Sequence, residues 1–182
     1  TDFANSDDDD QFTRKNSDVF NRVIFVSESD LRANASSLVG ADNGTVVGPY
    51  TQSSGILRLA KLVDTSNRPD SVEARHILIS GANAEERIDS IKSLINSGQS
   101  FSDLAQEFSE DRGSAANGGN LEWFAEGVMV TEFNDACFSA KKGELVSVNT
   151  QFGTHLIEVT DQSSKSKKYK VAYLDRRVEY SN

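Results

Sequence analysis

The sequence predicts an α+β fold in which strands and helices follow the order β-α-α-β-α-β-β over residues 71–161. Residues 72–79 (VEARHILI) alternate in the manner of a strand, which places Val72, His76 and Leu78 on one face. Two stretches with the helical spacing of apolar residues follow, and each begins at a residue that can cap a helix. Two short apolar runs then close the segment as a hairpin.

The two helices that follow the first strand have distinct start signals. Asn83 can cap the first helix, which runs through Ser97 and keeps its isoleucines on one face. Ser100 and Asp103 have the spacing of a capping box at the start of the second helix. After this helix, residues 109–120 are mostly small and polar and predict a long loop.

The remaining elements of this segment are short. Residues 121–124 predict a strand, and residues 132–140 predict a third helix that Gly143 ends. Residues 145–148 and 155–159 are the two apolar runs of the terminal hairpin.

The N-terminal third predicts less structure. Residues 1–20 are polar, lack a regular period and contain four consecutive aspartates, so we expect a flexible segment there. Residues 21–66 predict a helix that begins at Ser27 or Ser29 and then a β-hairpin, and residues 65–70 read as a linker. At the other end, residues 162–182 predict a basic spacer and a final strand.

The two hairpins share a sequence pattern. Gly44 and Gly143 each precede an apolar run and a Thr-Gln pair, and each hairpin ends at an aspartate, Asp64 or Asp161. This echo has two interpretations. The N-terminal segment is an internal repeat of the helix-plus-hairpin end of residues 71–161, without its front half, or two hairpins are alike by chance.

Composition excludes several classes of function. A single cysteine, Cys137, rules out an internal disulfide and a cysteine-based zinc site, and two histidines cannot form a three-histidine metal site. Residues 71–162 carry 15 Asp and Glu against 6 Lys and Arg, and the whole chain has a net charge of −9, which argues against a nucleic-acid partner. No apolar run approaches the ~18 residues of a membrane span. The chain lacks an initiator Met and a signal peptide, so we expect it to be a piece of a longer protein.

Few residues remain as candidates for chemistry. The sequence has no hydrolase nucleophile elbow and no glycine-rich phosphate-binding or dinucleotide-binding loop. His76, Asp111 and His155 are left. A metal site of two histidines and one carboxylate is one interpretation, but such sites usually keep a histidine and the carboxylate close in sequence. Two core histidines satisfied by hydrogen bonds are another.

Five stretches of residues 71–161 form a linked set of motifs. They are residues 74–79 (ARHILI), 101–109 (FSDLAQEFS), 113–121 (GSAANGGNL), 124–138 with Phe124, Met129 and Phe133, and 152–157 (FGTHLI). In their order and spacing these stretches, which cover about half of the chain, resemble the parvulin family of peptidyl-prolyl isomerases. The resemblance implies a four-stranded, mostly antiparallel sheet surrounded by helices and an isomerase that needs no cofactor or metal.

The family's functional residues carry over to matching positions. His76 and His155 match the paired histidines beneath the active site, Asp111 matches a position that is Cys or Asp, and Thr150 matches a nearby hydroxyl. The resemblance also implies an apolar wall that receives the proline ring. The residues at these wall positions are Leu121, Phe124, Met129, Val130, Phe133 and Phe152.

Two wall residues depart from the family pattern. Val130 stands where a Gln is common and Phe152 where a Ser is common, and both changes remove hydrogen-bonding groups. They leave open a catalytically weak, peptide-binding chaperone module of the same fold, or a scaffold that binds no peptide. The stretch after the first strand offers Arg87 among Glu85, Glu86 and Asp89, so no preference for phosphorylated substrates is expected.

Within the family, the flanking segments resemble the bacterial envelope foldases SurA and PpiD. This resemblance implies unfolded, proline-containing polypeptides as partners, a location in the periplasm or cell envelope, and a parent chain whose membrane anchor lies outside this fragment.

Overall fold

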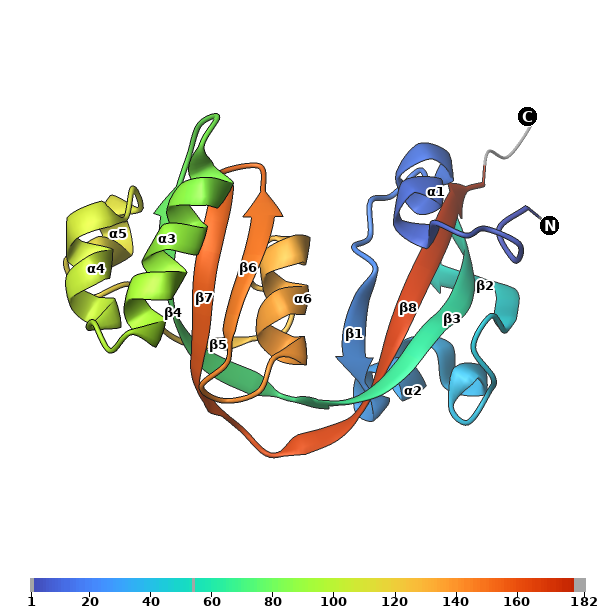
Figure 1. The fold of residues 1–182 in the computed structure, drawn as a ribbon. Coiled ribbons are helices and arrows are strands. Elements are labelled where there is room, and N and C mark those ends of the chain that lie inside the picture. Colours follow the sequence, from blue (N-terminus) through green and yellow to red (C-terminus); the bar gives the residue numbers. More distant parts are fainter. Residues whose placement is uncertain (1, 54, 179–182) are drawn as a thin grey trace. The chain divides into compact units, whose positions relative to one another are not determined.

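The computed structural model describes residues 2–53 and 55–178, which form two compact units (Figure 1). Unit 1 comprises Thr1–Arg68 and Ser166–Asn182, and unit 2 comprises Pro69–Lys165. Each unit contains one four-stranded sheet, with the order β1-β8-β3-β2 in unit 1 and β5-β4-β7-β6 in unit 2. Every strand pair whose register is described is antiparallel.

Unit 2 has the predicted α+β order with one addition. Its elements are β4 (Ser71–Ile79), α3 (Ala84–Asn96), α4 (Phe101–Phe108), α5 (Arg112–Ala115), β5 (Asn120–Ala125), α6 (Thr131–Ser139), β6 (Leu145–Thr150) and β7 (Gly153–Gln162). The added element is α5, a single helical turn inside the segment that was predicted to be a loop. It forms because the Asp111 carboxylate caps it by accepting the N–H of Gly113.

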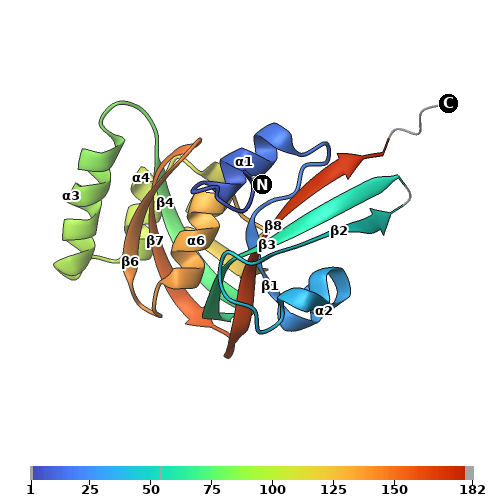
Figure 2. The ribbon, with the colours of Figure 1, turned by 90° about the vertical axis from the view of Figure 1, so that its right-hand side faces the viewer.

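Helices cover both faces of the sheet of unit 2. Figure 2 shows α3 and α6 on opposite sides of β6 and β7. Ile77 and Ile79 of β4 face one way and pack with Ile88 of α3 and the apolar face of α4. Val72 and Ala74 face the other way and pack with the buried side of α6. Because both faces of β4 are covered, the strand is apolar on both, and His76 belongs to the α6 side.

Unit 1 is built from both ends of the chain. Its elements are α1 (Asp9–Asn16), β1 (Ile24–Ser27), α2 (Glu28–Ala35), the 3₁₀-helix η1 (Ser36–Leu38), β2 (Val46–Ser53), β3 (Ile56–Pro69) and β8 (Lys165–Arg177). Helix α2 begins as predicted, because Ser27 caps it and forms a reciprocal capping box with Asp30.

Three sequence-based expectations for unit 1 are wrong. Residues 1–20 contain helix α1 rather than only a flexible polar segment, residues 65–69 continue β3 instead of forming a linker, and β8 begins at Lys165, inside the predicted spacer. Helix α1 is held by contacts that its own sequence does not reveal. Its Thr13 is buried, and the buried carboxylate of Asp9 accepts a hydrogen bond from the Lys61 ammonium at 2.9 Å.

The two hairpins, one in each unit, make equivalent contacts within their own units. The N–H of Gly44 donates to the carbonyl of Leu62 at 2.7 Å, and the N–H of Gly143 donates to Val159 at 2.8 Å. In each hairpin, the aspartate two residues beyond that carbonyl accepts one hydrogen bond from the side chain of the residue before the glycine. It accepts a second one from the backbone N–H of the residue that follows the aspartate. These donors are Asn43 and Thr65 for Asp64, and Lys142 and Gln162 for Asp161.

The two sheets also place these hairpins alike. Beside the second hairpin strand lies β8 in unit 1 and β4 in unit 2, with β1 or β5 at the far edge. In unit 1 this neighbouring strand, β8, comes from the C-terminal end of the chain. In unit 2 the neighbouring strand, β4, precedes its own hairpin. Helix α2 packs on the unit 1 sheet through Leu31 and Ala35, as α6 packs on the unit 2 sheet through Phe133 and Cys137.

Candidate functional site

Adjacent strands bring the two histidines of the chain together. His155 of β7 stands opposite Leu78, and His76 of β4 stands opposite Ile157, so the imidazoles lie diagonally on one face of the sheet. Their rings stack with centroids 5.3 Å apart and planes 15° apart. Both residues are about 95% buried, and their Nδ1 atoms lie 3.0 Å from each other.

The partners at the two ends fix the direction of this hydrogen bond. Asp111 Oδ2 lies 2.8 Å from His76 Nε2, and a carboxylate can only accept, so His76 carries its hydrogen on Nε2. In a neutral ring, Nδ1 of His76 is then an acceptor, and His155 Nδ1–H donates to it. His155 Nε2 in turn accepts from the Thr150 hydroxyl at 2.8 Å, and that hydroxyl accepts from the Phe152 N–H.

Electrostatics agree with two neutral imidazoles. Burial lowers the pKa of His155 to about 4, with a further contribution from His76, and burial also lowers the pKa of His76 despite the nearby Asp111. Burial alone would raise the pKa of Asp111, but hydrogen bonds from Ser114 and His76 outweigh it, and its pKa lies below the usual value. The site therefore holds one carboxylate and a neutral histidine pair at neutral pH.

An apolar cavity of ≈ 420 Å³ opens above the histidine pair. Its wall is mostly aliphatic and aromatic, and its polar groups are the two imidazoles and Asp111. The lining residues are His76, Leu78, Asp111, Leu121, Val128, Met129, Val130, Phe133, Phe152 and His155. The Phe133 ring stands nearly perpendicular to both imidazoles, at 86° to His76 and 79° to His155, with ring centroids 5.5 Å from His76 and 5.2 Å from His155.

A comparison with protein families identifies the family of this chain. The model of the family described as the PPIC-type PPIASE domain matches residues 57–163, more than half of the chain. The chain belongs to the parvulin, or PPIC-type, peptidyl-prolyl isomerase family. The resemblance predicted from the sequence motifs is confirmed, and so is the α+β parvulin fold.

Foldases and chaperones of this parvulin family are among the relatives. Foldase protein PrsA of Geobacillus kaustophilus is 42% identical over 54% of this chain and 34% of its own length, and Chaperone SurA of Alkalilimnicola ehrlichii is 36% identical over 69% and 32%. The crystal structure of peptidylprolyl isomerase PrsA from Bacillus cereus has a TM-score of 0.49 and 39% identity, over 53% of this chain and 36% of that chain. The chain thus spans about a third of the length of the curated relatives it matches.

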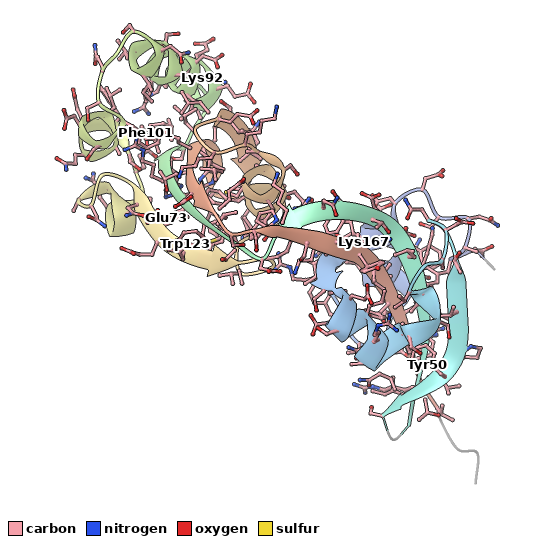
Figure 3. All side chains as sticks on the ribbon, turned by 90° about the horizontal axis from the view of Figure 1, so that it is seen from below. Tyr50, Glu73, Lys92, Phe101, Trp123 and Lys167 are labelled. Atoms are coloured by element: carbon pink, nitrogen blue, oxygen red, sulfur yellow. The ribbon has the colours of Figure 1, made fainter. Side chains whose placement is uncertain are left out.

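The parvulin unit places eight of the ten predicted site residues around the cavity. The other two, Thr150 and Phe124, do not line it. Thr150 lies behind the site, where it orients His155. Phe124 is buried in the core beneath the wall, with its ring centroid 6.5 Å from that of Phe133 and 6.0 Å from that of Phe138. Its neighbour Trp123 in β5, labelled in Figure 3, is 48% exposed.

Sequence reasoning missed three residues of the parvulin site. Leu78 and Val128 line the cavity, and the buried Ser114 donates to Asp111 Oδ2 at 2.6 Å while lying 3.1 Å from His76 Nε2. The signal for Leu78 was present, because strand alternation puts it on the face of His76. Ser114 could not be found in this way, since it approaches only through the turn of α5.

Two glycines let the segment after α5 pass close to its neighbours, Gly118 to Ser102 of α4 and Gly119 to His76 of β4. The N–H of His76 donates to the carbonyl of Gly119 at 2.9 Å, and a Cβ on Gly119 would overlap the carbonyl oxygen of His76. Gly118 and Gly119 both have φ in the left-handed region, at 65° and 80°, which favours glycine. These glycines thus seat β5 and the wall residue Leu121 beside β4.

Over residues 2–53 and 55–178, no group of three or more His, Cys, Asp or Glu side chains is placed to hold a metal ion. Over the same residues, no helix combines the length and apolar character needed to cross a membrane.

Proposed function

We propose that unit 2 catalyses cis–trans isomerisation of X-Pro bonds in unfolded polypeptides, without a requirement for phosphorylation. The observation that carries this proposal is the apolar cavity over a neutral, hydrogen-bonded histidine pair with one adjacent carboxylate. The relatives named foldase and chaperone support polypeptides as the substrate class. Because the chain spans only part of those relatives, the activity of the whole protein belongs to the same proposal.

The reaction needs no nucleophile. Rotation about the peptide bond has a barrier of about 18–20 kcal/mol because the resonance of the C–N bond is lost at the twisted geometry. The cis and trans forms of an X-Pro bond differ by only about 0.5–1 kcal/mol, so both are available as substrates. A site that binds the twisted amide more tightly than the planar one accelerates the reaction tenfold for each ~1.4 kcal/mol of that preference.

The cavity residues supply such a preference in three ways. Leu121, Met129 and Phe133 form the slot that holds the proline ring while the preceding carbonyl rotates. The dry wall removes water from the amide, which favours the less polar twisted state over the resonance-stabilised planar one. The histidine pair forms a rigid floor, and Asp111 holds its tautomer.

The charges near the site argue against phosphorylated substrates. Arg87, the one basic residue in the stretch after β4, forms an exposed ion pair with Glu110 at 3.1 Å. Glu85 and Glu86 at the start of α3 add negative charge. A phosphate on the substrate would meet net negative charge. We therefore expect faster catalysed cis–trans exchange for a peptide without a phosphate before proline than for the same peptide with one.

The test is two-dimensional NMR exchange on unphosphorylated X-Pro tetrapeptides. Phe133→Ala and Phe138→Ala form a matched pair, since both remove a buried phenylalanine from α6 but only Phe133 lines the cavity. Both substitutions cost about 3–5 kcal/mol of stability, so folding is verified by circular dichroism at the assay temperature. We expect exchange catalysis from wild type and Phe138→Ala and its loss in Phe133→Ala. Exchange at the uncatalysed rate with wild type on every peptide would refute the proposed isomerase activity.

The exposed rim of the cavity supports a second candidate, a peptide-holding module with weak catalysis. Val128 is 63% and Phe152 is 56% exposed, although both are large apolar side chains beside the slot. A holding function predicts suppression of client aggregation that survives Asp111→Ala but falls when Met129 is made polar. A catalytic function predicts instead that the measured activity falls in Asp111→Ala.

The same proposal includes a place in the cell envelope, which rests on the resemblance to envelope foldases. Fractionation of cells that produce the full-length parent protein tests it. Recovery with periplasmic or envelope fractions is the expected result, and recovery with the cytoplasm would refute it.

A further inference from the structure

The loop between β5 and α6 supplies much of the proline slot. It comprises residues 126–130, and Val128, Met129 and Val130 all line the cavity. Val128, at the tip of this loop, is 63% exposed, so the rest of unit 2 leaves the tip uncovered. In unit 1 the matching connection has no such loop, because β1 ends at Ser27 and α2 begins at Glu28. Contacts from α6 therefore have to hold this loop in place.

Asn134 of α6 is placed to hold it. Its side chain is 1% exposed and lies on the helix beside the slot residue Phe133. Asn134 Oδ1 accepts the N–H of Gly127 at 2.7 Å, and Nδ2 donates to Glu126 Oε1 at 3.1 Å. Gly127 has φ of 85°, in the left-handed region, so the loop turns at the residue that Asn134 binds.

The two contacts also fix the orientation of the amide. If Oδ1 and Nδ2 were exchanged, the amide NH₂ would face the N–H of Gly127 and the carbonyl oxygen would face the carboxyl oxygen of Glu126. Both pairs would then repel. Asn134 therefore recognises a donor and an acceptor on two consecutive loop residues at once, a pattern that a purely apolar core residue cannot supply.

We propose that Asn134 is a positioning residue for substrate binding, which acts by fixing loop 126–130 so that Met129 and Val130 face the proline ring. The inference rests on the proposed function of unit 2. Removal of the Asn134 amide takes away the acceptor of the Gly127 N–H and the donor to Glu126, so residues 126 and 127 lose these side-chain bonds to α6, while the Val130 carbonyl keeps its bond from the Asn134 N–H at 2.9 Å. The wall then forms only part of the time, and substrate binding weakens in proportion.

Met129 provides a probe of the loop that does not depend on activity. It is the only methionine of the chain, so ¹³C-methyl-methionine labelling gives a single resonance from the slot. We expect this resonance to shift when a proline peptide is added to wild type. In Asn134→Leu, which keeps the volume but removes both hydrogen bonds, we expect a shifted and exchange-broadened resonance and an about tenfold rise in KM with a smaller change in kcat.

The control and the rescue separate positioning from stability. Phe138→Ala destabilises the same helix but removes neither of the Asn134 hydrogen bonds to the loop, so its Met129 resonance should stay close to that of wild type. Asn134→Asp places two carboxyl groups together, and the added Glu126→Gln restores a donor–acceptor pair and should recover KM. An unchanged Met129 resonance and KM in Asn134→Leu would overturn the positioning role. If wild type neither accelerates exchange nor shows a peptide-induced shift, the proposed function fails instead.

Discussion

The Nδ1 atoms of His76 and His155 lie 3.0 Å apart, and only one of them carries a hydrogen. The arrangement therefore depends on both rings staying neutral. A proton added to His76 would go to Nδ1 and set its N–H against that of His155, in a buried place where water cannot relieve the repulsion. A proton added to His155 would go to Nε2, where it takes away the acceptor of the Thr150 hydroxyl. The carboxylate of Asp111 at one end and the Thr150 hydroxyl at the other keep the pair in a single tautomeric state.

Stability should consequently fall on mild acidification. The pKa of His155 is about 4 in the folded chain and about 6.5 when unfolded, so the unfolded state binds the proton first as pH falls. The free energy of unfolding then decreases from pH 6.5 towards pH 4, and the lowered pKa of His76 acts in the same direction. Urea unfolding of wild type and of the double variant His76→Gln/His155→Gln between pH 7 and pH 5 checks this. Equal slopes for the two proteins would contradict it.

The sequence predicted unit 2 far better than unit 1, for a physical reason. Strand β4 and helix α6 show their periods because each buries a continuous apolar face within a contiguous segment. Helix α1 buries little apolar surface of its own, and its Asp9 partner Lys61 is remote in sequence. The extension of β3 and the early start of β8 could not be read locally, because the two strands are neighbours in the unit 1 sheet although all of unit 2 separates them in the sequence.

The same distinction applies within the site. His76, His155 and Phe133 follow from motifs on regular elements, whereas Ser114 and Asn134 act through contacts that only the fold creates. The position that His155 has in β7 is held in unit 1 by Arg58 of β3, which stands opposite Tyr50 as His155 stands opposite Val148. No local motif announces such a correspondence.

Asp111 should act mainly as a hydrogen-bond acceptor for His76. Its Oδ2 accepts from both His76 and Ser114, and an asparagine carbonyl in the same place can do so as well. We expect Asp111→Asn to keep kcat/KM within about threefold of wild type, and Asp111→Ala to lower it about tenfold through loss of a charge-assisted bond. Peptide exchange rates measure both variants. An asparagine variant as impaired as the alanine variant would show that the charge itself is required.

The Arg58–Asp175 ion pair should make unit 1 sensitive to single substitutions. The guanidinium contacts both carboxylate oxygens, at 2.6 and 2.7 Å, with side-chain exposures of only 8% and 1%, and it lies over the Tyr173 ring. Asp175→Ala leaves a buried cation unpaired and should cost about 3–5 kcal/mol, whereas Arg58→Met with Asp175→Leu should be nearly neutral. Urea unfolding tests the difference. A double variant as unstable as the single one would contradict this account.

Phe152 should contribute to peptide affinity without contributing to stability. It is 56% exposed at the rim of the cavity, so removing its ring uncovers little core but deletes apolar surface that a bound peptide would cover. We expect Phe152→Ser to raise KM for peptides with a large apolar residue beside proline several-fold, with an unchanged thermal midpoint. Phe20→Ser is the matched control, because Phe20 is 59% exposed and lies outside the cavity. An equal rise in KM for both variants, or for neither, would show that the rim does not bind peptide.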